Sequence, residues 1–151
     1  QMIYSGVFMK NFKNLILALL LPLILLFALT SCNDVIENGE KTVKIILGGE
    51  EYTLSTSADN LHLALIMLKE KENIDYEYEE FAFGIMIKKA GGVTPTDSEF
   101  IAIYHDLEKT EYIYFGNDTE YNGKTYHLSG VGAKDLPLVN GASYLIKTET
   151  F

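Results

Sequence analysis

TVKIILGGEEYTLSTSADNLHLALIMLKE, residues 42–70, is the stretch of sequence that decides the fold class. Its first part, residues 42–47, is β-branched and apolar and ends at a Gly-Gly pair, which predicts a strand. Residues 52–55 are the expected hairpin partner across a turn at residues 48–51. We therefore expect the domain to begin with an antiparallel pair of strands.

A helix is predicted next, over residues 60–70. Apolar side chains recur there at helical spacing and form one stripe of Leu61, Ala64, Leu65 and Leu68. The stripe is widened by three more apolar residues, Leu63, Ile66 and Met67. We expect this helix to be covered on more than one side. Ser57 or Asp59 is the expected N-cap, because a side-chain oxygen can accept a hydrogen bond from the free N–H groups of the first turn.

The following segments are predicted to be mainly strands. Alternation over residues 74–79 places Tyr76 and Tyr78 on one face and acidic residues on the other. Further strands are expected at residues 81–88, 100–104, 112–115 and 143–148. Turns are expected at residues 117–118, 122–123 and 140–141, and a loop or a short helical turn at residues 130–138. These elements predict an α+β domain, a small, mostly antiparallel sheet with one main helix, preceded by an N-terminal signal helix.

The N-terminal part predicts an export signal. Lys10 and Lys13 precede the apolar run 15–29, which is shorter than the roughly 20 residues that a membrane-spanning helix needs. Leu-Thr-Ser-Cys at residues 29–32 resembles a lipobox, so we expect cleavage before Cys32 and a lipid on its thiol. The alternative is an uncleaved anchor followed by an ordinary cysteine. Both place the domain on the extracytoplasmic face of the cell membrane.

The expected domain boundaries follow from this signal. Residues 1–8 are an upstream extension or a miscalled start, and residues 9–31 are the lipoprotein signal peptide. Residues 32–41 are polar and acidic and predict a lipidated tether. Residues 42–151 form the folded domain.

Charge and cysteine content exclude several classes of function. Two of the twelve lysines and none of the 21 acids precede Cys32, so the processed chain would carry ten lysines and a net charge of −11. The sequence contains no arginine, and a chain this acidic is repelled by nucleic acid. Cys32 is the only cysteine, which excludes intramolecular disulfides and a cysteine zinc site.

The histidines and acids are the candidate metal ligands or catalytic groups. His105, Asp106 and His127 are the candidate metal ligands, although no two histidines have a short metal-ligand spacing. Asp75, Glu77, Glu79 and Glu80 could gather calcium or could form a solvated charged strand edge.

Motifs of enzymes are missing from the sequence. Ser129-Gly130 lacks the Gly-x-Ser-x-Gly elbow, and no dinucleotide-binding fingerprint follows a predicted strand. We expect no enzymatic activity. A hydrolase built on Glu77 or Glu79 with a histidine brought near by the fold is the remaining enzymatic alternative.

Tyrosines concentrate in the C-terminal half and could supply flat, amphipathic contact area for a ligand. The candidate ligand-binding residues are Tyr104, Tyr112, Tyr114, Tyr126, Gly130 and Gly132. The alternative is that these tyrosines serve the cores and edges of strands.

The order of segments resembles the transcobalamin C-terminal-like domain family, found in bacteria on exported and surface-anchored proteins. The matching segments are TVKIIL, Ala64-Leu65 in the helix, Phe83-Gly84-Ile85-Met86-Ile87, Gly130-Val131, Leu136-Pro137-Leu138, Asn140-Gly141 and Tyr144. The resemblance covers residues 41–151. It implies a small β-rich fold and export, with a corrinoid or a divalent metal as the implied ligand.

Together these observations predict a non-catalytic, membrane-tethered binding domain. Its membrane contact is the lipid, such as palmitate, on Cys32, and its ligand is a small molecule, a corrinoid or metal among the candidates. The alternative function is an envelope adhesion or assembly module that acts through contacts with another envelope protein. No nucleic-acid partner is expected.

Overall fold

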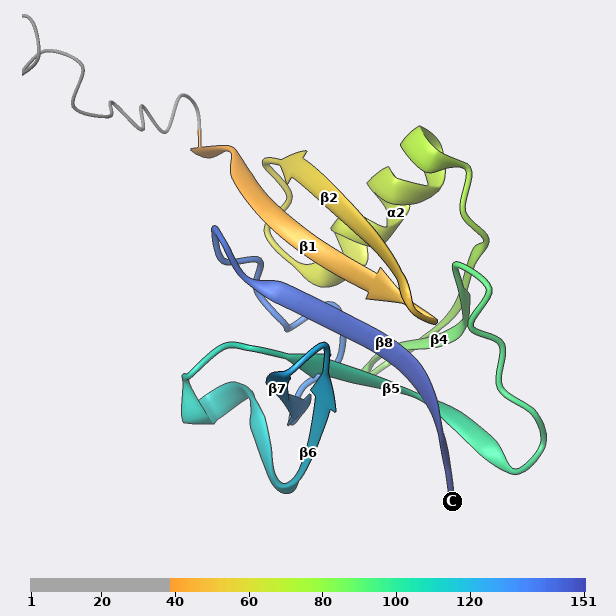
Figure 1. Cartoon of the computed structure of the whole chain (residues 1–151). Helices are drawn as coiled ribbons and strands as arrows, with labels where there is room; N and C mark the ends of the chain where they lie inside the picture. The colour runs from red at the N-terminus through yellow and green to blue at the C-terminus, as the bar shows by residue number, and fades with distance from the viewer. Residues whose placement is uncertain (1–38) are drawn as a thin grey trace, which may run out of the picture. The chain divides into compact units, whose positions relative to one another are not determined.

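The structure is a computed structural model that describes residues 39–151. The predicted signal peptide, the lipidated Cys32 and most of the predicted tether lie outside the described residues. The described elements, labelled as in Figure 1, are β1 (Lys41–Leu47), β2 (Glu50–Thr56), α2 (Leu61–Glu72), β3 (Tyr76–Phe81), β4 (Gly84–Ala90), β5 (Glu99–His105), the 3-10 turn η2 (Thr110–Tyr112), β6 (Ile113–Tyr121), β7 (Lys124–Ser129) and β8 (Ser143–Thr150).

Six strands form the main sheet, in the order β2-β1-β8-β5-β7-β6, and β3 pairs only with β4 in a separate hairpin. Neighbouring strands are antiparallel except β1 and β8, which run parallel. The expected α+β fold, a mostly antiparallel sheet with one main helix, is therefore confirmed in residues 39–151. None of the helices among these residues is long and apolar enough to span a membrane.

Helix α2 covers one face of the sheet. Leu61, Ala64, Leu65 and Leu68 are buried, as the helical spacing predicted. They pack against the inward side chains of β1 and β8, including Ile45 and Tyr144, to form the first core. Leu63 is 42% exposed, so α2 is covered less completely than expected. The predicted N-cap was wrong: the Asn60 side chain accepts the hydrogen bond from the Leu63 N–H at 3.0 Å.

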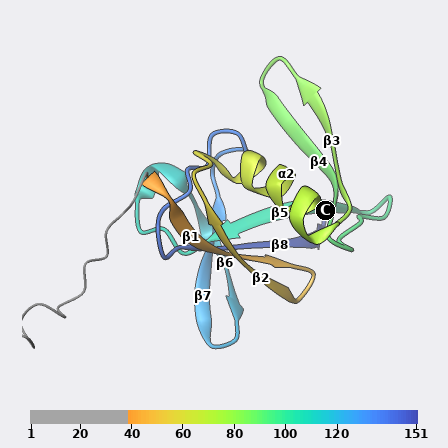
Figure 2. The same cartoon turned by 90° about the horizontal axis from the view of Figure 1, so that it is seen from above.

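A second core lies on the opposite face of the sheet. Ile46, Ala102 and Leu145 from the central strands meet Tyr104 and Tyr126 there. Figure 2 shows α2 and the β3–β4 hairpin on one side of the sheet and the β6–β7 hairpin on the other. The β6–β7 hairpin thus covers the face that α2 leaves open.

Three local predictions differ from the structure. Residues 81–88 are not one strand, because β3 ends at Phe81 and the chain turns before Gly84, whose φ of 138° favours glycine. Residues 117–118 are not a turn but part of β6, where a register shift between Ile113 and Asp118 absorbs extra residues as a bulge. Strand β7 was missed. The predicted turn at residues 122–123 joins β6 to β7 and is confirmed.

Candidate functional site

The candidate site is a hollow of about 400 Å³ on the face covered by the β6–β7 hairpin. Four segments line it: the turn 48–49, the loop 92–94, residues 119–121 of β6, and Leu145, Lys147 and Thr148 of β8. We call it the glycine hollow, because its rim includes Gly48, Gly49 and Gly92. These segments are brought together by the sheet rather than by their closeness in the sequence.

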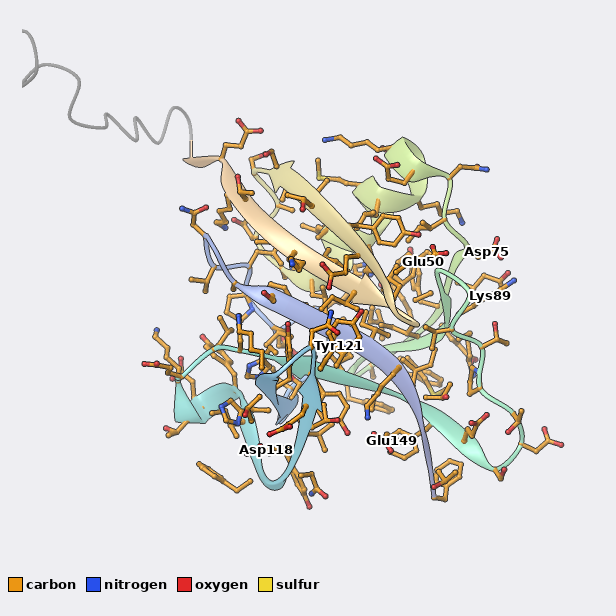
Figure 3. The ribbon with its side chains drawn as sticks, viewed as in Figure 1. Glu50, Asp75, Lys89, Asp118, Tyr121 and Glu149 are labelled. Carbon is orange, nitrogen blue, oxygen red and sulfur yellow. The ribbon has the colours of Figure 1, made fainter. Side chains whose placement is uncertain are left out.

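Tyr121 holds the β6–β7 hairpin over the sheet. Its hydroxyl donates a hydrogen bond to the Gly49 carbonyl at 3.1 Å, and the neighbouring Asn122 amide donates to Glu51 at 3.2 Å. Figure 3 shows Tyr121 at the end of this hairpin, over β8. Both contacts join residues about 70 positions apart and close the hollow on the β1–β2 side.

Lys147 supplies the fixed positive charge of the glycine hollow. Its Nζ donates to the Thr119 hydroxyl at 3.0 Å and lies 2.7 Å from the carboxylate of Glu149. It also lies 5.1 Å from the centre of the Tyr104 ring, within range of a cation–π contact. Because three neighbours restrain this ammonium group, its position is set before any ligand arrives.

Glu149 and Tyr104 complete the network behind Lys147. The buried Tyr104 hydroxyl donates to Glu149 at 2.8 Å. The hydrogen bond from Lys147, followed by that from Tyr104, lowers the pKa of Glu149, whereas burial raises the pKa of Tyr104. The network therefore holds an ionised lysine–carboxylate pair beside a neutral phenol.

The six candidate ligand-binding residues do not share one surface. Tyr104 and Tyr126 are buried in the second core, whereas Tyr114 is 57% exposed on β6. Tyr112 lies on the other side of the sheet, where it packs against the first core. Gly130 is close to the Ile113 backbone, and Gly132 has open space around it. Ligand binding by any of these residues stays a prediction.

The three candidate metal ligands are engaged in protein contacts. The buried His105 uses both ring nitrogens, since Nε2 donates to the Tyr112 carbonyl at 2.8 Å and Nδ1 accepts from the Leu107 N–H at 3.2 Å. Asp106 accepts from the Ser143 N–H at 2.8 Å and pairs with Lys124.

His127, on β7, is the cross-strand neighbour of His105 and lies 2.9 Å from Asp118. Among residues 39–151, no three His, Cys, Asp or Glu side chains come close enough to hold a metal ion together. Metal binding by His105, Asp106 or His127 stays a prediction.

The acidic residues of the β3–β4 region form ion pairs with lysines at the surface. Asp75 lies 2.7 Å from Lys89, a pair visible in Figure 3, and Glu79 lies 3.0 Å from Lys88. Glu80 pairs with Lys134. The acids are spread along the hairpin, which matches the predicted charged strand edge rather than a calcium cage.

Sequence reasoning missed the residues of the glycine hollow. Two Gly-Gly pairs, at 48–49 and 91–92, were visible in the sequence but indicated only turns. Lys147 and Tyr121 carried no motif, because their role arises from contacts across the sheet. The pairing of strands far apart in sequence was needed to find them.

Comparisons with known proteins bear on the fold. No protein-family model matches the sequence, and no curated protein matches it significantly. The solved structure of haptocorrin in complex with Cbi is similar over 80% of this chain and 29% of the haptocorrin chain, with 14% identity and a TM-score of 0.51. This likeness supports the expected transcobalamin-like α+β fold.

A second solved structure, of a proposed metal binding protein from Ruminococcus gnavus ATCC 29149, is similar over 74% of this chain and 97% of its own. Its sequence identity is 18% and its TM-score is 0.46. The matched region spans less than a third of haptocorrin.

Proposed function

We propose that this chain is a non-catalytic, membrane-tethered extracytoplasmic lipoprotein whose domain, residues 42–151, binds a small ligand in the glycine hollow. The observation that carries the proposal is a hollow of about 400 Å³ with a prepositioned ammonium group, Lys147. Ligand sites in proteins usually have volumes of about 300–1,000 Å³ and combine apolar walls with a few fixed polar groups.

The lining indicates the chemistry of the ligand. Val93, Leu145 and the Tyr121 ring offer apolar surface, whereas Thr94, Thr119 and Thr148 offer hydroxyl groups. Lys147 is already paired with Glu149, and Glu120 also lines the hollow, so the hollow favours a neutral molecule with hydroxyl or carbonyl acceptors. Glycines at the rim let such a molecule approach the backbone closely.

Only a part of a corrinoid molecule can enter this hollow. Its macrocycle is too broad to enter, but one of its peripheral amide side chains is of the right size and polarity. The haptocorrin structure holds Cbi, and its similarity to this domain supports including a corrinoid among the candidates. Cys32, with its predicted lipid, would hold the domain at the membrane, where a short tether keeps it close to ligands arriving from outside.

Thermal unfolding and calorimetric titration of the purified protein test the proposal. The probes are a corrinoid, neutral mono- and oligosaccharides, and Ca²⁺ and Zn²⁺ salts. A ligand at 100 times its Kd stabilises the fold by about 2.7 kcal/mol, which raises the Tm of a domain of this size by about 10 °C.

A matched pair of variants locates the site. Thr94→Trp places a large ring in the glycine hollow from an exposed position, whereas Thr110→Trp adds the same ring at an exposed position on η2. We expect Thr94→Trp to abolish the ligand-induced rise in Tm and Thr110→Trp to retain it. Equal responses of the two variants, or no response of the wild type to any probe, would contradict the proposal.

A further inference from the structure

Strand β5 has an open edge over most of its length. All seven of its residues pair with β8 on one side. On the other side, β7 pairs only with Tyr104 and His105. Within the described chain, residues 99–103 therefore lie at an edge of the sheet although β5 is a central strand by order.

The outward backbone groups on this edge belong to odd-numbered residues, of which the Glu99 N–H already donates to the Thr96 carbonyl at 3.1 Å. The Asp106 N–H donates to the Ser143 carbonyl at 3.2 Å, and hydrogen-bonded pairs alternate along an antiparallel ladder. Even-numbered β5 residues thus pair with β8, whereas Ile101 and Ile103 direct their N–H groups away from it. In residues 39–151, no loop or side chain donates to or accepts from Ile101.

An apolar hollow of about 270 Å³ runs along this edge. Its far wall consists of Tyr114, Leu128, Ser129 and Val131, and no charged residue lines it. Phe100 and Tyr114 are 38% and 57% exposed beside it. A strand placed in this hollow would gain apolar contacts as well as backbone hydrogen bonds.

Other edges of the described sheets are protected against strand addition. β2 carries Glu50 and Glu51, and its Ser55 carbonyl accepts from Lys71 at 3.4 Å. β3 and β4 carry acids and lysines, and β6 combines acidic residues with a bulge. Charges and bulges of this kind normally prevent edge pairing. Residues 100–104 of β5 have neither.

We propose that the open edge of β5 accepts an extended segment of a partner protein as an additional strand. The segment would alternate apolar residues, which face Tyr114 and Phe100, and would pair with both backbone groups of Ile101 and with the Ile103 N–H. A domain with a large excess of acids attracts a basic segment and repels a second copy of itself. This site is separate from the glycine hollow and does not depend on it.

Amide hydrogen exchange of the free protein gives the first readout. The N–H groups of Ile101 and Ile103 should exchange at least about tenfold faster than those of Ala102 and Tyr104, which pair with β8. Equal protection at odd and even positions would mean that the edge is covered and would overturn the proposal.

Binding is then measured with the capped synthetic peptide KVTVTVK by NMR titration. Two analogues are N-methylated, one at both threonines and the other at the three valines. Each analogue loses the N–H donors on one of the two edges of the peptide strand. One analogue should bind at least about tenfold more weakly, and the other should retain binding, because only one face pairs with β5.

Protein variants provide the complementary control. Ile101→Pro removes the outward N–H at a position where proline is tolerated on an edge, and Ile101→Val keeps it. We expect Ile101→Pro to lose the peptide and both Ile101→Val and Thr94→Trp to bind it. If Ile101→Pro does not fold, the two N-methylated peptides still test the proposal.

Three further results would overturn the proposal. One is equal binding of the two methylated peptides, and another is no binding of KVTVTVK at millimolar concentration. The third is a dimer of the chain that the peptide displaces, because the edge would then belong to a second copy.

Discussion

Acid should destabilise the fold well above the pH at which carboxylates titrate, because two histidines are buried in neutral form. His105 has no exposed surface, and its two ring nitrogens are committed to one donated and one accepted hydrogen bond. His62 lies in α2, 6% exposed, with Nδ1 at 2.7 Å from the Tyr76 hydroxyl. Burial is the main cause that lowers the pKa of both from the ordinary value of 6.5.

The sign and the size of the effect follow from proton linkage. A histidine whose pKa is lowered in the folded state binds more protons when the chain is unfolded. Such a histidine leaves the free energy of unfolding unchanged above pH 6.5 and lowers it as the pH falls below that value. The loss is at most about 1.4 kcal/mol per pH unit for each histidine, or about 2 kcal/mol for each between pH 7 and 5. Together the two could remove at most about 4 kcal/mol, a large fraction of a typical domain stability of about 5–15 kcal/mol.

Urea unfolding at a series of pH values between 7 and 5 measures the slope. His105→Gln should reduce the slope, and it should lower stability at pH 7 by about 1–3 kcal/mol through imperfect replacement of the two hydrogen bonds. Leu107→Ala is the matched control. It removes a buried side chain of the same region and keeps both histidines, so its curve should fall in parallel with that of the wild type.

Carboxylates whose pKa is lowered, such as Glu149, titrate below the pH range of this experiment and do not affect the slope. A His105→Gln variant that retained the full wild-type slope would show that His105 is not the neutral, desolvated group that the hydrogen bonds require. The reasoning would then fail for His105, whatever the stability of the variant.

Three further predictions concern packing, backbone and anchoring. Leu65→Ala should cost about 2–5 kcal/mol of unfolding free energy because Leu65 has no exposed surface, whereas Leu63→Ala, at 42% exposure, should cost much less; urea unfolding compares them. Gly91→Ala should destabilise far more than Gly92→Ala, as judged by Tm, although both have positive φ. A Cβ at Gly91 would lie 2.5 Å from the Leu47 side chain, and one at Gly92 would meet open space. Cys32→Ser should abolish labelling by a palmitate analogue in cells and release the protein from the membrane fraction; labelling of the variant equal to that of the wild type would contradict the predicted lipidation.

The sequence was sufficient for elements held together by local interactions. The β1–β2 hairpin, α2 and the closing strand β8 were predicted because apolar periodicity and Gly-containing turns act over a few residues. The capping residue was missed by one position, since Ser57, Asp59 and Asn60 are all chemically suitable caps. Which of them caps depends on where the chain leaves β2.

The candidate site could not be predicted from the sequence, because it depends on contacts between segments that are far apart in the chain. The glycine hollow depends on the parallel pairing of β1 with β8, which joins segments about 100 residues apart, and on Tyr121 reaching Gly49. β7 was missed because its sequence KTYHLS alternates weakly and has only one fully buried side chain, Tyr126. The tyrosines that did attract attention include two, Tyr104 and Tyr126, that serve the second core.

The two proposed binding sites have a common structural origin in the irregularity of β6. Between the pairs Ile113–Ser129 and Asp118–His127, β6 contains more residues than β7, so residues 114–117 bulge out of the ladder. The bulge lets the end of β6 turn over β8, where Thr119 and Tyr121 close the glycine hollow. It also places Tyr114 beside the edge of β5 at the point where β7 stops pairing with it. The irregular part of β6 therefore borders both the glycine hollow and the open edge of β5, and bulges of this kind often re-aim side chains beside binding sites.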